Sequence, residues 1–336
     1  MSENAKIYSK VCSQIGFAML LFYAFFTLST FGVAIFSGML EMIIGKFASD
    51  VVYEILGSIV YFLSFSSAAY ILRRMTKKLP TSRPIYTSFK LSKSIILLII
   101  AIVAVNYTLA FLNSLLVTSI VPTFGTGIST SNPDLVGKPM GKVITLFVLS
   151  IISTAVVPAI SEEYLFRGAV LTNLLPFGKT TAIIGSAFLF GFMHQNPMQL
   201  LYTTLMGIVI GYVYVKTKSI WACILIHFVN NLVTVLEEYL PYITKIEWID
   251  GLLNLIVLVV GGISLVWLLF TKDKEPSIEE NGSFGVVYER GMDVEEFELE
   301  LSRKEKIKKF FSPTMIIYSA ICVFLMLKAL ISFFNV

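Results

Sequence analysis

Charged residues are scarce in this 336-residue sequence. Asp, Glu, Lys and Arg make up 14% of it, whereas hydrophobic residues make up 56%, and the mean hydropathy is +0.80. An ordinary soluble domain carries roughly 25% charged residues. The deficit therefore excludes a water-exposed surface over most of the chain and predicts a membrane protein. The apolar runs are continuous rather than alternating, which excludes a transmembrane barrel and favours spanning helices.

Cysteine and histidine are also rare. The three cysteines, Cys12, Cys223 and Cys322, lie far apart in or beside apolar segments. Their spacing fits neither a disulfide framework nor a metal site, so we expect them to be inert packing residues. The net charge of +4 is accounted for by basic loops. We expect no nucleic-acid partner, because no nucleic-acid-binding feature occurs in the chain.

Long apolar segments are what the sequence has in abundance. A spanning helix needs about 20 mostly apolar residues. The candidates are 15–38, 51–72, 94–117, 143–165, 180–197, 198–215, 219–237, 249–270 and 313–334. They predict an all-α, polytopic membrane bundle of about eight or nine transmembrane helices.

The basic residues predict the orientation of these spans. The loop 73–93 holds seven Lys and Arg residues and no acidic residue. Loops of this kind stay on the cytoplasmic side of a membrane. Counting spans outward from this loop places the N-terminus in the cytoplasm. We therefore expect a multi-pass protein of the cell membrane with a cytoplasmic N-terminus.

Residues 271–312 differ in kind from the rest. They hold 19 of the charged residues, acidic first and basic later. One interpretation is a solvated cytoplasmic linker with a single amphipathic helix before the last span. The other is a docking site for a protein partner. The basic cluster could also lie against anionic lipid headgroups.

A charged cluster closes the fourth predicted span. Charges within spans are costly, so they are treated first as functional candidates. Glu162 and Glu163 are adjacent there, and Arg167 lies four residues after Glu163, so these two can pair on one helix face. Glu162 points about 100° away from that face. A partly buried carboxylate without a fixed partner could act as a general base. The alternative is a charge cluster that snorkels to the membrane interface.

The two histidines form the other candidates. His194 ends the fifth predicted span, four residues after Phe190, whereas His227 lies in the seventh. Asn231 follows His227 by four residues, so the two share a helix face. Buried histidines are commonly structural. Here both lie in apolar runs beside other polar groups, which favours a functional role.

These residues form three motifs that follow one another along the chain: EExxxR (Glu162, Glu163, Arg167), FxxxH (Phe190, His194) and HxxxN (His227, Asn231). Together they resemble the CPBP family, also called the Abi or CAAX-protease family, which contains the type II CAAX prenyl endopeptidases. The resemblance covers about residues 140–240. It implies an intramembrane endopeptidase.

The resemblance also implies a role for each motif residue. Glu162, assisted by His194, would activate a water molecule. His227 and Asn231 would stabilise the oxyanion formed at the peptide carbonyl. The remaining motif residues would be supporting groups; they are Glu163, Arg167 and Phe190.

A zinc-dependent version is the alternative mechanism. Glu162, His194 and His227 could supply the three ligands of a catalytic zinc ion. The sequence contains neither an HExxH helix nor a GxSxG elbow. We therefore expect no cofactor and keep Zn²⁺ as the alternative. With ideal spans, Glu162 would lie near one membrane face and His194 near the other. The two can meet only if the fourth helix is long or tilted, or if the turn 173–179 dips into the membrane.

The predicted organisation has three parts. Residues 1–141 hold three helices and the basic loop, 142–240 form a catalytic core, and 241–336 hold the last helices and the 271–312 segment. Expected partners are a peptide or lipid-anchored protein substrate and membrane lipids. Two other functions stay open: a non-proteolytic membrane regulator on the same fold, and a transporter. A transporter would predict inverted repeats, whereas the polar residues here cluster in one region.

Overall fold

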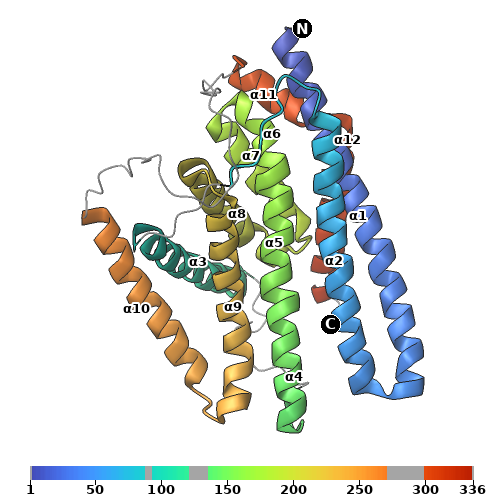
Figure 1. Ribbon diagram of the computed structural model, residues 1–336, viewed down its shortest axis with the longest axis vertical. Helices are drawn as coiled ribbons and strands as arrows, with labels where there is room; N and C mark the ends of the chain where they lie inside the picture. The colour runs from blue at the N-terminus through green and yellow to red at the C-terminus, as the bar shows by residue number, and fades with distance from the viewer. Residues whose placement is uncertain (1, 88–92, 121–134, 271–298, 335–336) are drawn as a thin grey trace.

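The computed structural model describes residues 2–87, 93–120, 135–270 and 299–334, and these ranges are almost entirely helical (Figure 1). The principal elements are α1 (Glu3–Ile44), α2 (Lys46–Thr76), α3 (Lys93–Ile120), α4 (Met140–Ser150), α5 (Val157–Glu163), α7 (Lys179–Met193), α8 (Pro197–Thr217), α9 (Ile220–Thr244), α10 (Ile249–Phe270), α11 (Arg303–Phe310) and α12 (Pro313–Phe334).

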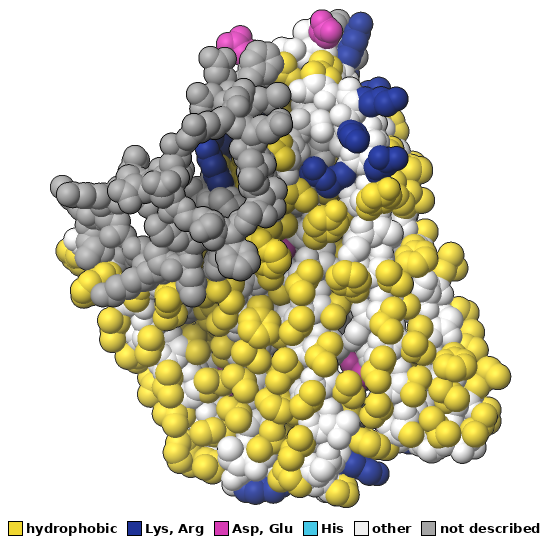
Figure 2. Space-filling model, viewed as in Figure 1, with side chains coloured by type: hydrophobic (Ala, Val, Ile, Leu, Met, Phe, Trp, Pro, Cys, Tyr) yellow, Lys and Arg dark blue, Asp and Glu magenta, His cyan; other side chains and the backbone are white. Residues whose placement is uncertain are grey.

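Among the residues that the structure describes, eight helices are long and apolar enough to cross a membrane. This confirms the predicted all-α, polytopic bundle and makes the chain a membrane protein. Apolar side chains cover the middle of the surface, and Lys and Arg gather toward its two ends (Figure 2). The predicted span 180–197 is shorter than expected. It is α7, whose 15 residues extend only about 22 Å, less than the roughly 30 Å of a bilayer core.

The fourth span is longer than expected. Helical structure runs without a break over Met140–Phe177, 38 residues in all. Within it, α5 lies between two π-helical segments, η3 (Ile151–Val156) and η4 (Tyr164–Leu171); two short turns, α6 (Thr172–Leu174) and η5 (Leu175–Phe177), complete it. α4 and α5 form one column between α9 and α2 (Figure 1). Since the predicted span ended at residue 165, the extra turns place Glu162 well inside the helix.

Backbone carbonyls in the π-helical segment η4 accept hydrogen bonds from neighbouring elements. In a π-helix each carbonyl pairs five residues on instead of four. Ser186 donates to the carbonyl of Phe166 at 2.9 Å, and Arg73 donates to that of Gly168 at 2.9 Å. The irregular helix is therefore tied to its neighbours by directed hydrogen bonds.

Glycine allows close helix packing around this column. α1 and α2 form a hairpin joined at Gly45, which has a φ of +79°. α12 returns to pack on α1, and a Cβ at Gly16 would lie 2.5 Å from the backbone nitrogen of Met315. A Cβ at Gly207 of α8 would lie 2.9 Å from the Cα of Ala187 in α7. Small residues of this kind let membrane helices approach backbone to backbone.

The 271–312 segment is described only from residue 299 onward; its acidic part lies outside the described residues. The described part contains a helix before the last span, as predicted. α11 begins with a capping box between Ser302 and Glu305. Phe310 at its end is buried and contacts Phe188 of α7, with ring centroids 6.2 Å apart. The end of α11 is thereby packed against the core.

Candidate active site

The two adjacent glutamates close α5, in the interior of the bundle. Glu162 is 3% exposed and Glu163 is 0% exposed. A charge cluster at the membrane interface would keep its carboxylates in contact with water, so the snorkelling interpretation is wrong for both. Burying carboxylates is costly unless each is paired or hydrogen-bonded. The surrounding residues supply those partners.

Glu163 is the centre of a buried chain of charges. Its Oε1 accepts a hydrogen bond from Nη1 of Arg167 at 2.7 Å and lies 2.9 Å from Nδ1 of His227. The pairing that the four-residue spacing predicts is therefore present. Arg167 also donates to the carbonyl of Gly207 at 3.2 Å, and its guanidinium lies 4.9 Å from the ring centre of Phe190. These contacts fix His227 through Glu163.

Glu162 has a different environment from its neighbour. Its Oε1 accepts a hydrogen bond from the hydroxyl of Tyr61 in α2. Its Oε2 lies 4.0 Å from Nε2 of His227 and has no hydrogen-bond partner among the described residues. One carboxylate oxygen is therefore held, and the other faces the imidazole that Glu163 orients. Glu163 Oε2 also has no hydrogen-bond partner among the described residues, so the feature that distinguishes Glu162 is the imidazole Nε2 beside its open oxygen.

Sequence reasoning missed Tyr61, which lies 101 positions before Glu162 and outside the three motifs. Its ring stacks on Phe65 at 4.6 Å and meets Phe26 edge-on at 5.6 Å. The only available signal was a hydroxyl-bearing residue within an apolar span, and this chain contains several such tyrosines. Only the packing of α2 on α5 shows which of them reaches the glutamate.

His194 joins the site indirectly. Its Nδ1 lies 2.8 Å from the carbonyl oxygen of Phe190, and the two rings are 5.0 Å apart. The ring of Phe190 in turn lies 6.0 Å from that of His227. Across the described part of the chain, His194 forms no hydrogen bond or ion pair with either glutamate. Phe190 therefore separates the two imidazoles and packs against both.

Asn231 lies on the same helix as His227 but contacts a different element. Its Nδ2 donates to the carbonyl of Thr154 in η3 at 3.0 Å. That bond uses one of its two N–H donors. The neighbouring Asn230, which sequence reasoning did not select, is buried and donates to Tyr202 at 3.3 Å and to Asn231 at 3.2 Å. A hydrogen-bonded amide pair thus extends the site toward η3.

The described residues do not form a preformed ligand set for the zinc ion of the alternative mechanism. Within residues 2–87, 93–120, 135–270 and 299–334, no group of three His, Cys, Asp or Glu side chains could hold a metal ion. Glu162 and His227 lie together, whereas His194 is turned toward the backbone of its own helix. The absence of a cofactor stays a prediction that a chelator experiment can test.

Known proteins share the region that holds this site. Residues 144–233 match the family described as "Type II CAAX prenyl endopeptidase Rce1-like". This confirms the resemblance that the three motifs predict, and the matched residues include every motif position. Residues 144–233 are thus an Rce1-like region.

A curated relative extends the comparison. The chain is 30% identical over 145 residues to the protein named "Putative membrane peptidase YdiL" from Bacillus subtilis (strain 168). The aligned part is 42% of this chain and 56% of that protein, so the chain spans little more than half of the relative's length. No solved structure matches the chain. Both matches point to membrane peptidases.

The buried ion pair can be tested by stability. Arg167→Met would leave Glu163 charged and without its cation, which typically costs about 3–5 kcal/mol for a buried pair. We expect a clearly lower unfolding midpoint in detergent and partial recovery in the double variant Arg167→Met/Glu163→Gln. The matched control is Lys46→Met, which breaks an exposed pair of the same spacing, Lys46–Asp50. It should cost roughly 0.5 kcal/mol or less. Equal losses in both single variants would contradict a buried pair.

Proposed function

We propose that this protein is an intramembrane endopeptidase of the glutamate type, with Glu162 as the general base. The observation that carries the proposal is the position of Glu162 Oε2, which lies 4.0 Å from His227 Nε2 inside the bundle. A carboxylate with one held oxygen and one unpartnered oxygen can take a proton from a water molecule placed beside the imidazole. The matches to membrane peptidases support the same reaction class.

The proposed reaction is hydrolysis of a peptide bond by a water molecule. Glu162 accepts a proton from the water, and the resulting hydroxide attacks the peptide carbonyl carbon. His227 donates through Nδ1 to Glu163, so in this scheme it acts as an imidazolium, whose second N–H at Nε2 can donate to the oxyanion. This N–H and the second N–H of Asn231 stabilise the negative charge that develops on the carbonyl oxygen. Glu162 then delivers the proton to the leaving nitrogen as the carbon–nitrogen bond breaks. The products are a carboxylic acid and an amine, which ionise to a carboxylate and an ammonium group.

His194 assists from the far side of Phe190 in this scheme. If its Nδ1 donates to the Phe190 carbonyl, its Nε2 carries a lone pair and can accept a proton. Because the reacting groups are buried among spanning helices, the proposed substrate is membrane-associated. A peptide segment and a lipid-anchored protein both fit that description. No metal is required for any of these steps.

The first test is loss of cleavage in Glu162→Gln, which keeps the shape of the side chain but cannot take up the proton. With a quenched fluorescent peptide library and purified protein, we expect the rate to fall roughly 100- to 10,000-fold. Activity of the wild type should persist in a metal chelator. Loss of wild-type activity in chelator would contradict the metal-free mechanism. Wild-type protein that cleaves neither soluble nor lipid-anchored peptides would contradict the peptidase proposal and favour a regulator.

The second test concerns the tyrosine hydroxyl that holds Glu162. Tyr61→Phe removes only this donor, and a hydrogen bond to a charged group contributes about 1.5–3 kcal/mol. We expect kcat to fall by about tenfold or more with little change in KM. Tyr53→Phe is the matched control, because Tyr53 lies on the same helix and is 42% exposed. The same loss in both variants would show a general effect on α2 instead.

We further propose that the protein lies in the cell membrane with its N-terminus in the cytoplasm, because of the basic residues that follow α2. A cysteine introduced at Lys78, which is exposed, should react with an impermeant maleimide in inside-out vesicles but not in intact cells. A cysteine at Lys142, near the opposite end of the bundle, should show the reverse pattern. The three native cysteines are buried and should give little background. Labelling of both sites from one side would contradict the topology.

A further inference from the structure

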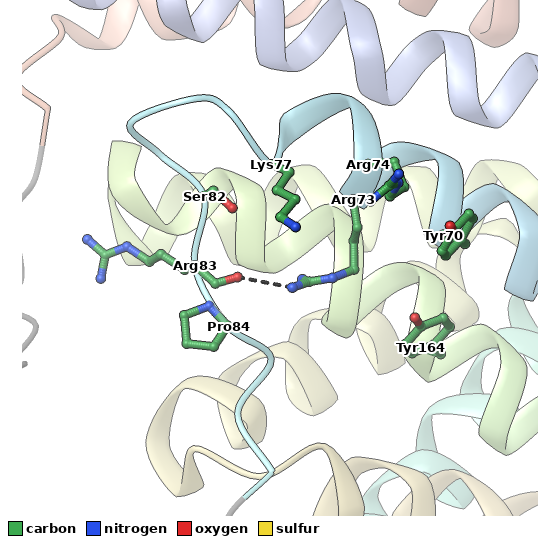
Figure 3. Close-up of a pocket in the computed structure, with 8 residues that line it drawn as sticks. All are labelled: Tyr70, Arg73, Arg74, Lys77, Ser82, Arg83, Pro84 and Tyr164. Carbon is green, nitrogen blue, oxygen red and sulfur yellow. Dashed lines mark hydrogen bonds between the residues drawn. The ribbon is translucent and has the colours of Figure 1, made fainter. Parts of the chain in front are cut away.

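A pocket of about 440 Å³ lies beside the last turns of α2, outside the candidate active site (Figure 3). One wall is the end of α2, another is the segment that follows it, and η4 contributes a tyrosine. The lining residues are Tyr70, Arg73, Arg74, Lys77, Ser82, Arg83, Pro84 and Tyr164. None of these lining residues is acidic, so the pocket is strongly electropositive.

The cationic side chains that line the pocket differ in direction. Arg73 and Lys77 point into the space between α2 and the following segment, whereas the side chain of Arg83 points away from it (Figure 3). Arg74 lies at the rim, with its guanidinium 6.0 Å from the ring centre of Tyr70. Two positive groups therefore face the interior of the pocket and a third borders it. The hydroxyls of Ser82 and Tyr164 are further possible donors.

Arg73 is held in place by the protein. It donates through Nη1 to the carbonyl of Gly168 at 2.9 Å and through Nη2 to the carbonyl of Arg83 at 3.3 Å. A guanidinium has five N–H donors, so these two bonds do not exhaust its capacity. A cation fixed in this way has already lost much of its side-chain freedom. It would bind an anion with a small entropic penalty.

The partial negative charge at the C-terminal end of α2 is too small to neutralise the cations beside it. The C-terminal end of a helix carries only about half a negative charge. Arg73, Arg74 and Lys77 bring three full positive charges to the last turns of α2. Most of that charge is left uncompensated by the helix and by the residues that line the pocket. An anionic ligand would neutralise the remaining positive charge.

The pocket lies where lipid headgroups would be expected. Below it, α2 exposes apolar side chains to the membrane, among them Ile59, Phe62 and Leu63. Tyr70 follows at 58% exposure, and the cations come directly after it. Aromatic residues mark the membrane–water interface, and cations beyond them face the headgroups. In Figure 2, Lys and Arg side chains gather just beyond the apolar surface at this end.

We propose that this pocket binds the phosphate of an anionic phospholipid headgroup. Arg73 and Lys77 would contact the phosphate, and the acyl chains would run along the apolar face of α2. A substrate carboxylate is the competing ligand, and peptides with free or amidated C-termini distinguish it from a lipid phosphate. The proposal does not depend on the peptidase activity.

The test is lipid binding to the purified full-length protein in neutral detergent, followed by native mass spectrometry. The probes are dioctanoyl phosphatidylglycerol and dioctanoyl phosphatidylcholine, which differ in net charge but share their tails. We expect tighter binding of phosphatidylglycerol, weakened by salt. Removing one cation near the surface should weaken it about fivefold. Arg73→Gln/Lys77→Gln should therefore weaken it about 25-fold and abolish most of the preference.

Two single variants keep the result interpretable. Lys77→Gln alone leaves the hydrogen bonds of Arg73 intact, so a fivefold loss of binding there does not come from breaking them. Lys78→Gln removes a neighbouring exposed charge that does not line the pocket and should change binding little. An equal loss in Lys78→Gln and Lys77→Gln would overturn the proposal, because it would show a diffuse charge effect.

Two further outcomes would reassign the pocket. If millimolar inorganic phosphate displaced phosphatidylglycerol completely and bound as tightly, the pocket would be a free-phosphate site and the lipid assignment would fail. If the double variant instead lost affinity for peptides with a free C-terminal carboxylate, relative to amidated peptides, the ligand would be the substrate. Retention of phosphatidylglycerol binding by the double variant would also overturn the proposal.

Discussion

The buried ion pair between Arg167 and Glu163 is the interaction on which the rest of the site depends. Two adjacent carboxylates inside a membrane bundle repel each other and are poorly solvated, so one of them must be neutralised. Arg167 does this at 2.7 Å and is itself held by the Gly207 carbonyl. Because Glu163 is paired, it can orient His227, and Glu162 is left to face that histidine. The four side chains therefore form one electrostatic unit drawn from α5, η4 and α9, and α8 adds the backbone carbonyl of Gly207.

The helix that carries this unit is held in place by hydrogen bonds to its backbone. Carbonyls in the two π-helical segments around α5 accept hydrogen bonds from Asn231, Ser186 and Arg73. In an apolar medium these bonds are the main directed contacts available to a helix. They fix the rotation of α5 and thus the directions of the two carboxylates.

Several of these features could be predicted from the sequence. Continuous apolar runs predicted the helices, and the four-residue spacing predicted the Glu163–Arg167 pair. The length of the fourth helix was missed because the charged cluster Glu162, Glu163 and Arg167 interrupts the apolar run, although the helix continues to Phe177 in the protein interior. The shortness of α7 was missed because its composition resembles that of a full span. Tyr61 was missed because its contact joins helices distant in the sequence.

The hydrogen bond from Tyr61 to Glu162 also shows that the Rce1-like region is not structurally independent of α2. The Rce1-like region begins at residue 144, yet one oxygen of its central carboxylate is held by a helix that ends at Thr76. The carbonyl of Gly168 likewise relies on Arg73 of the same helix. A fragment cut at the borders of that region would carry every motif but leave a buried acid and a backbone carbonyl without donors. The modular boundary drawn by sequence similarity therefore falls inside a single cooperative assembly, and any transplant of the site would have to carry α2 with it.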